Sequence, residues 1–451
     1  MSEHAQALEN DPEFLMRCAH THNWDVLMDF CNNVVMETFL GTPVDSFQES
    51  HDQRVEAAMR QLTSVDQWGN NALHACCYHR PPVCVVAALL NAASAVPRNG
   101  QQRRAPIQIH LVRARDGSTP LQVASACGAS LPVLRRLLYP PDGLWNGGGL
   151  VMCLDCQGLG PLSELTLQYA LERQQTLHSR TNNPPLEEVN LLHANIGQDN
   201  DELSPSPLLN AFWNKVDLLL RAAWSADPLV EGRDGQLFVR RSCRRHGQRI
   251  QPKRSTGWVS ILHAAAKIAG MIPETLFDVI CRSYPHLIGY ADSQSGRLPL
   301  HVAIDFIGLD RGHRDGSGTV RQFPLINFSR NLCIGKLVDL YPAAVRTKVD
   351  GRSTLCRAIA AGVPWSIATK DVKGPLCAIS EVEPEAILER DSETQLYPFL
   401  LAASVAESLE GVTEDDSITV ITLGNIYHLL RIHPQLLTEI RKGQSGDEEV
   451  P

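Results

Sequence analysis

One short pattern recurs along the chain and constrains its fold more than any other feature. It consists of a glycine, a leucine four or five residues later and, in most copies, an alanine two or three residues after the leucine. The glycine permits the positive φ of a tight turn, and the leucine and alanine share one face of a short helix. One such unit cannot bury its apolar face alone, so successive units must stack. The copies begin at Gly69, Gly117, Gly158, Gly257, Gly296 and Gly351, and a reduced copy spans Tyr397–Ala402.

A second apolar segment follows most copies of the pattern. These segments are Val83–Leu90, Val133–Leu138, Leu276–Cys281 and Leu332–Leu340. Two of them end at Tyr284-Pro285 and Tyr341-Pro342, where the proline prevents the helix from continuing. The alternation of a turn, a short helix, a turn and a longer helix predicts an all-α helical solenoid.

The motif resembles that of the ankyrin-repeat family, whose consensus has Asp and Gly in a turn, the finger, and Thr-Pro-Leu-His at the start of the first helix. Thr119–Leu121 and Pro299–His301 match that opening, and His74 and His263 match its histidine. The degenerate copies are similar to those of diatom and algal ankyrin proteins. The resemblance implies an ankyrin-like solenoid in which the histidine is a structural hydrogen-bonding residue.

The spacing of the copies predicts long loop insertions. The equivalent leucines Leu262 and Leu300 are 38 residues apart, and Leu162 and Leu262 are 100 apart, whereas a regular ankyrin repeat has about 33 residues. The polar composition of Gln174–Ser206 predicts disorder over most of that stretch, and Ala211–Ala223 is expected to add a helix. We expect five parts: an N-terminal helical cap (1–59), a first repeat block (60–173), a partly disordered insertion (174–254), a second repeat block (255–441) and an acidic tail (442–451).

We expect a cytoplasmic protein that does not bind membranes, and we expect it to be a monomer. The 451 residues include 41 Lys and Arg and 50 Asp and Glu, a net charge of -9, so the whole chain does not attract nucleic acid or anionic lipid. No basic segment followed by an apolar one opens the sequence, and the longest apolar stretch, Val83–Val96, is too short to cross a bilayer. The 13 cysteines are thinly spread, which is typical of a reducing compartment.

No motif predicts catalysis, a metal or a cofactor. His313–Asp315 spells the start of a kinase catalytic loop, but Val320 stands where that loop needs a metal-binding Asn. Cys153–Cys156 has the spacing of half a zinc site, yet it overlaps the third finger. The repeats leave little room for an enzyme, so we expect none. An alternative is that the protein is an enzyme whose active site lies in the divergent region Gln174–Gly257.

A basic segment stands out in this acidic chain. It has seven basic residues and no acidic one: Arg240, Arg241, Arg244, Arg245, Arg249, Lys253 and Arg254. We interpret this segment mainly as a solvated surface loop. An alternative is a nuclear regulatory protein that contacts nucleic acid or an acidic partner through this segment, which also resembles a nuclear import signal. No aromatic residue interleaves with the arginines, which disfavours nucleic-acid binding.

Stacked repeats favour a scaffold that binds another protein across the fingers and first helices. The candidate contact residues are finger positions that we expect the turn itself not to require: Gln67, Trp68, Asn70, Ser118, Arg297 and Arg352. Trp68 leads, because tryptophan is a frequent interface anchor. The alternative for Trp68 is a ring folded over the adjacent finger.

Overall fold

The computed structural model divides into two compact units, Met1–Leu229 and Val230–Pro451, each of which is described by itself. The residues that the structure describes are 11, 13–39, 48–95, 109–112, 114–139, 148–151, 153–157, 159–180, 207–224, 236–240, 256–292, 295–306, 324–366, 373–409 and 416–435.

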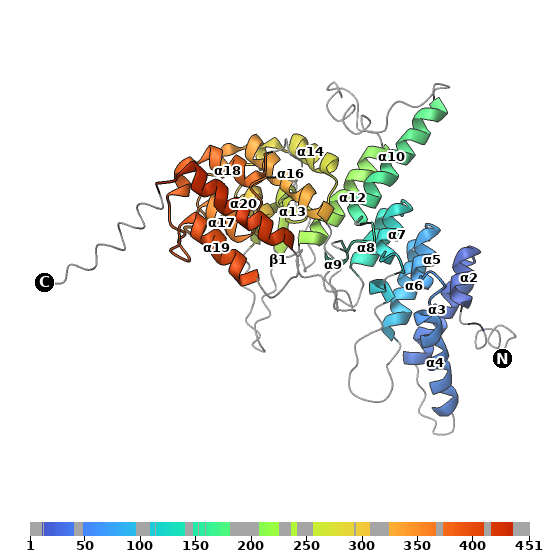
Figure 1. The fold of residues 1–451 in the computed structure, drawn as a ribbon. Helices are drawn as coiled ribbons and strands as arrows, with labels where there is room; N and C mark the ends of the chain where they lie inside the picture. The colour runs from blue at the N-terminus through green and yellow to red at the C-terminus, as the bar shows by residue number, and fades with distance from the viewer. Residues whose placement is uncertain are drawn as a thin grey trace. The chain divides into compact units, whose positions relative to one another are not determined.

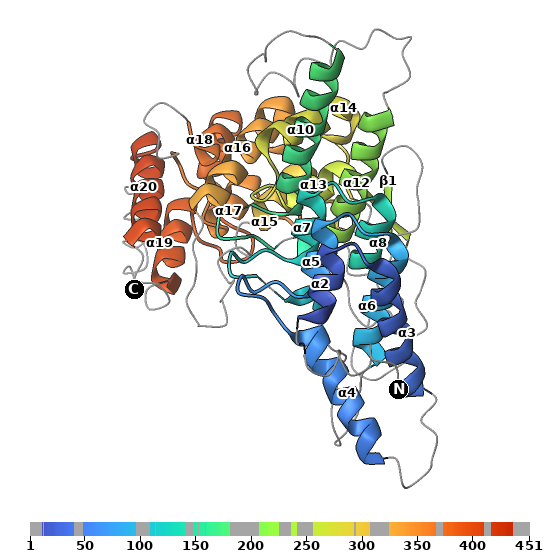
Figure 2. The same cartoon turned by 90° about the vertical axis from the view of Figure 1, so that its right-hand side faces the viewer.

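The first unit is built from two layers of helices. In the first layer α5 packs on α2 and on α7, and α7 packs on α10 (Figure 1). In the second layer α3 packs on α6, α6 packs on α8, and α8 packs on α12 (Figure 2). The helices are α2 (Phe14–His20), α3 (Trp24–Phe39), α4 (Gln48–Thr63), α5 (Ala72–Tyr78), α6 (Val83–Ala95), α7 (Pro120–Ala126), α8 (Leu131–Leu138), α9 (Gly148–Val151), α10 (Pro161–Arg180) and α12 (Pro207–Trp224), with the 3-10 turn η1 (Ile109–Leu111).

The second unit repeats this arrangement. Its first layer is α13, α15, α17 and α19, its second layer is α14, α16 and α18, and α20 packs on α19. Its helices are α13 (Ile261–Lys267), α14 (Glu274–Ser283), α15 (Pro299–Asp305), α16 (Pro324–Leu340), α17 (Thr354–Ala360), α18 (Pro375–Val382), α19 (Pro398–Leu409) and α20 (Asp416–Ile432), with the 3-10 turns η2 (Pro285–Leu287), η4 (Pro342–Ala344) and η5 (Pro384–Ile387). The strands β1 (Gln236–Arg240) and β2 (Thr256–Ser260) pair antiparallel, with Gln236 opposite Ser260.

The repeated leucines form the centre of both cores. Leu73, Leu121 and Leu262 have no exposed surface, and Leu300 has 1%. Burying a leucine side chain contributes about 1.5–3 kcal/mol relative to leaving it exposed. These leucines lie near the start of the short first-layer helices α5, α7, α13 and α15. The prediction of a predominantly helical chain is confirmed.

The finger turns are organised by their aspartates. The Oδ1 atom of Asp66 accepts the backbone N–H groups of Trp68 and Asn70, each at 2.8 Å. Gly69 has φ +81°, and a Cβ there would lie 3.0 Å from the backbone nitrogen of Arg115. That close approach exists because the Arg115 N–H donates to the carbonyl of Trp68 at 2.8 Å. Successive fingers are therefore hydrogen-bonded to one another.

The end of the first unit differs from the expected boundaries. Helix α10 runs across residue 173 to Arg180, so residues 174–180 are helical, and the disorder expected from Gln174 does not begin there. The expected helix near 211–223 is α12, and it packs on α8, α9 and α10. The reason is a buried apolar face that includes Val216 and Leu219, together with a ring stack of Phe212 on Tyr169 at 4.3 Å.

Several predictions fall on residues outside the described ranges. They concern the rest of the polar stretch (181–206), the basic segment after Arg240 (241–255), the kinase-like tripeptide (313–315) and the acidic tail (442–451). Arg240 itself is the last residue of β1. The boundary expected at residue 59 lies within α4.

Candidate functional site

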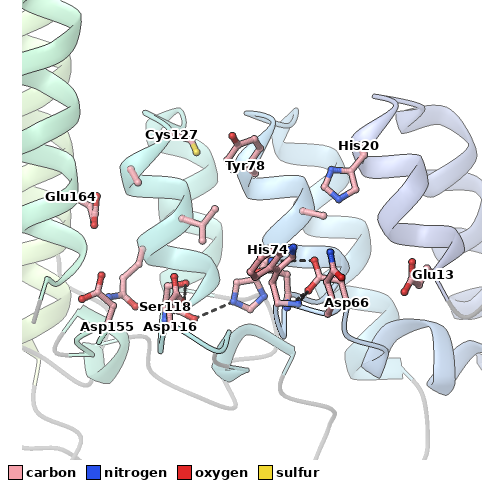
Figure 3. Close-up of a pocket in the computed structure, with 17 residues that line it drawn as sticks. Glu13, His20, Asp66, His74, Tyr78, Asp116, Ser118, Cys127, Asp155 and Glu164 are labelled. Carbon is pink, nitrogen blue, oxygen red and sulfur yellow. Dashed lines mark hydrogen bonds between the residues drawn. The ribbon is translucent and has the colours of Figure 1, made fainter. Parts of the chain in front are cut away.

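A groove of about 990 Å³ runs over the first layer of the first unit. We call it the finger groove. It is lined by finger residues 66–68, 70, 116, 118 and 155, by Glu13, and by side chains of α2, α5, α7 and α10 together with the residue after α7 (Figure 3). The stacking of short helices, each entered from a finger turn, produces this shape, because every finger projects beside the helix that follows it.

Carboxylates line the finger groove along its length. The finger residues Asp66, Asp116 and Asp155 lie along one edge, and Glu13 and Glu164 lie toward its two ends (Figure 3). No lysine or arginine is among the lining residues, and in the described part of the chain none of the five carboxylates is ion-paired. The described lining of the finger groove is therefore negatively charged.

The titration of Glu164 reflects that charge. Partial burial raises the pKa of the Glu164 carboxyl, and the negative charges of Asp155 and Asp116 raise it further. These neighbouring negative charges disfavour a further negative charge on Glu164. A positively charged ligand in the finger groove would relieve this repulsion.

Two aromatic side chains of the finger groove are open to solvent. Trp68, in the first finger, and Tyr78, at the end of α5, are each 63% exposed. Trp68 therefore does not have its ring buried against the adjacent finger. Gln67 lies beside it and is also exposed. Tyr78, Asp116 and Glu164 were not among the sequence candidates, although the aspartate before Gly117 follows the finger pattern of Asp and Gly.

Asn70 and Ser118 line the finger groove, but they also belong to their turns. The side-chain amide of Asn70 donates to Asp66 Oδ2 at 3.1 Å. The hydroxyl of Ser118 donates to Asp116 Oδ1 at 2.7 Å, and its backbone N–H donates to the same atom at 2.9 Å. The expectation that the turn does not require these two positions is therefore corrected.

Arg297 and Arg352 lie in the second unit, and each is paired with carboxylates of other elements. Arg352 forms two hydrogen bonds to the carboxylate of Asp391, at 2.6 and 3.1 Å, and a third to Glu393 at 2.7 Å. Arg297 pairs with Asp305 at 3.3 Å and with Asp350 at 3.8 Å. Both side chains therefore connect separate elements of the chain, outside their own turns, and are engaged in contacts that a partner would have to replace.

His74, one of the two histidines that line the finger groove, has a structural environment. The backbone N–H of Asn71 donates to His74 Nδ1 at 3.2 Å, which leaves Nε2 to donate to the carbonyl of Ser118 at 3.3 Å. Burial lowers the pKa of His74 to about 4, so the ring is neutral near pH 7. Burial also raises the pKa of Cys127, the only cysteine lining the finger groove, which keeps it a thiol.

The described residues contain no group of three or more His, Cys, Asp and Glu side chains that could hold a metal ion. Cys153 is half-buried and Cys156 is exposed on the third finger, where its backbone N–H donates to the carbonyl of Asp116. Within the same ranges, no helix has both the length and the apolar character needed to cross a bilayer.

The chain was compared with known protein families and with curated proteins, and no family or curated protein matches it.

Proposed function

We propose that this chain is a non-enzymatic scaffold that binds another protein, and that its two units are ankyrin-like solenoids. Support for the solenoid comes from the regular succession of finger, first helix and second helix, and from the hydrogen bonds that join one finger to the next, such as Arg115 to Trp68 and Cys156 to Asp116. Each repeat then contributes one finger and one helix to a continuous surface.

The observation that carries the proposal is the finger groove with Trp68 and Tyr78 exposed in it. A surface tryptophan and tyrosine on a concave face are the residue types that most often anchor a protein partner. Their rings bury a large area at a low cost in side-chain entropy, because each has only two rotatable side-chain torsions. The finger groove spans three fingers, so an extended segment or a loop of a partner fits it better than a small molecule does.

The chemistry of the finger groove favours binding over catalysis. Asp66, Asp116 and Asp155 each accept hydrogen bonds from their own turn, and His74 donates to the next finger. A general base or nucleophile needs a free lone pair near a proton donor of matched pKa. These aspartates and His74 are used for hydrogen bonds within and between the fingers, so they do not supply such a pair of base and proton donor.

The test is a comparison of bound proteins between variants of the full-length chain. Affinity capture followed by mass spectrometry should recover a set of proteins with the wild type that Trp68→Ala and Tyr78→Ala lose. The matched control is Leu167→Ala, which removes a side chain that is 52% exposed on α10 and does not line the finger groove. If Trp68→Ala and Leu167→Ala retain the same set of proteins, the finger groove is not the binding surface.

A further inference from the structure

The charge, the aromatic rings and the spacing of the fingers together define the class of partner that suits the finger groove. Its five carboxylates come from four successive elements of the first layer: Glu13 before α2, Asp66 before α5, Asp116 before α7, and Asp155 and Glu164 at the start of α10. The negative charge is thus distributed along the stack instead of being concentrated at one point. A ligand that carries one cation per repeat would meet a carboxylate at each step.

The exposed rings favour arginine over lysine as that cation. A guanidinium group is planar, stacks on the face of tryptophan or tyrosine and donates two parallel hydrogen bonds to a carboxylate. Trp68 lies next to the finger aspartate Asp66, and Tyr78 lines the same finger groove from the end of α5. An arginine side chain in the finger groove can therefore stack on a ring and reach a carboxylate, whereas a lysine ammonium supplies only a point charge.

The repeat spacing sets the spacing of the cations. Packed helices lie about 8–10 Å apart, and an extended chain advances about 3.3 Å per residue. One repeat therefore corresponds to about three residues of an extended ligand that runs along the stack.

We propose that the finger groove binds an extended segment of a partner protein in which arginine recurs at about every third residue. This rests on the proposed function, since it specifies the chemistry of the partner at the same groove. Trp68 and Tyr78 stack on the arginine side chains, and the finger carboxylates pair with their guanidinium groups. The surface is acidic along its whole length, so acidic segments and nucleic acid are repelled from it.

The experiment measures peptide binding to the full-length protein by fluorescence anisotropy. The probe is a labelled twelve-residue peptide with arginine at every third position and alanine and serine between. Three comparison peptides replace arginine by lysine, replace arginine by glutamate, or cluster the same four arginines at one end. We expect affinity to fall in the order regular arginine, clustered arginine or lysine, and glutamate, with no detectable binding of the last.

The charge variant is Asp116→Asn with Glu164→Gln. The asparagine keeps the Oδ1 acceptor that Ser118 uses, and Glu164 has no hydrogen bond that the turn requires, so the fold should be preserved. We expect about ten-fold weaker binding of the regular arginine peptide, equivalent to about 1.4 kcal/mol. The matched control, Asp29→Asn with Glu56→Gln, removes two charges from α3 and α4, away from the finger groove, and should change the affinity less than two-fold.

The possible outcomes separate this inference from the proposed function. Equal weakening by both double variants would mean non-specific attraction and would overturn the inference. Absence of peptide binding, while Trp68→Ala still abolishes capture of partner proteins, would leave the binding function standing and reject an arginine-rich ligand. If no peptide binds and Trp68→Ala does not reduce the capture of partner proteins, both the inference and the proposed function are rejected. Equal affinity for the regular and clustered peptides would reject the three-residue spacing.

Discussion

At the residue scale, histidine and glutamine perform the same task at equivalent positions. His301 Nδ1 accepts the backbone N–H of Leu298 at 3.1 Å, and its Nε2 meets Thr354 Oγ1 of the next repeat at 3.1 Å. Gln122 accepts the N–H of Thr119 with Oε1 at 2.7 Å and donates from Nε2 to the carbonyl of Leu159 at 2.9 Å. Each side chain joins its own helix cap to the following repeat, which explains why glutamine can replace histidine in the motif.

Replacing Gln122 tests this equivalence. Gln122→Leu leaves the Thr119 N–H and the Leu159 carbonyl without these partners in a buried setting, and should lower the free energy of unfolding by about 1–3 kcal/mol. Gln122→His restores an acceptor and a donor and should cost less than about 1 kcal/mol. Urea unfolding of the full-length chain gives both values. Equal destabilisation by the two variants would contradict the equivalence.

His301 makes stability depend on pH. Burial, and then the nearby charge of Arg357, lower the pKa of His301 from 6.5 to about 4 in the folded chain. Because the unfolded chain takes up this proton at a higher pH, the stability is fully present above pH 6.5 and is lost as the pH falls toward 4. The loss from this residue amounts to about 2 kcal/mol between pH 7 and pH 5.

The substitution His301→Gln removes this titration and keeps a donor and an acceptor. The decrease in unfolding free energy from pH 7 to pH 5 should therefore be smaller in the variant than in the wild type by about 2 kcal/mol. Urea unfolding at the two pH values measures it. An identical decrease in both proteins would show that His301 does not titrate in this range.

At the scale of elements, neighbouring repeats are held together by their fingers as well as by their helices. Arg352 is 16% exposed, and its partner Asp391 is fully buried at the start of the next finger. Asp391 also accepts the N–H and the hydroxyl of Thr394 within its own turn. The ion pair therefore fixes the finger that precedes α17 relative to the finger that precedes α19.

Removal of this arginine should destabilise the second unit strongly. Arg352→Ala leaves the buried carboxylate of Asp391 without its cation and should cost about 3 kcal/mol or more. Arg352→Lys restores the charge but not the two parallel hydrogen bonds, so it should recover only part of that loss. Urea unfolding measures both. The control Arg346→Ala removes an exposed arginine and should stay within about 0.5 kcal/mol of the wild type.

At the scale of the whole molecule, the first unit is completed by a helix that follows a long polar stretch. Helix α12 packs on α8, α9 and α10, although residues 181–206 separate α10 from α12 in the sequence. The composition of that stretch, with consecutive prolines at Pro184-Pro185 and few large apolar residues, predicts that proteases cut there first. A cut at this place divides the first unit between two fragments.

Limited proteolysis of the full-length chain should therefore give two fragments that stay together. The packing of α12 against α8 and α10 should hold them in one peak during size-exclusion chromatography under native conditions, and denaturant should separate them. The identification of the cut by mass spectrometry is part of the test. Two separate peaks without denaturant would show that α12 contributes little to the first unit.

The sequence by itself determined the turns and the helices that follow them. Gly69 and Asp66 form their finger through bonds within five residues, and Thr119 and Ser260 cap the helices that begin beside them. These interactions are local, so the order of residue types predicts them. The apolar run 211–223 likewise predicted a helix, which is α12, but the sequence did not show that this helix belongs to the first unit.

Only the tertiary structure decided which finger residues stay exposed and which pair with a neighbouring finger. Arg352 was a candidate for binding until its contact with Asp391, 39 residues later, removed it from the free surface. Glu13 and Glu164 line one groove although about 150 residues of chain separate them. Such pairings depend on how repeats of unequal length stack, because an insertion changes the separation along the chain without changing the neighbour in space. A local pattern records the turn and the helix, whereas the charge and exposure of a side chain are set by the repeat beside it.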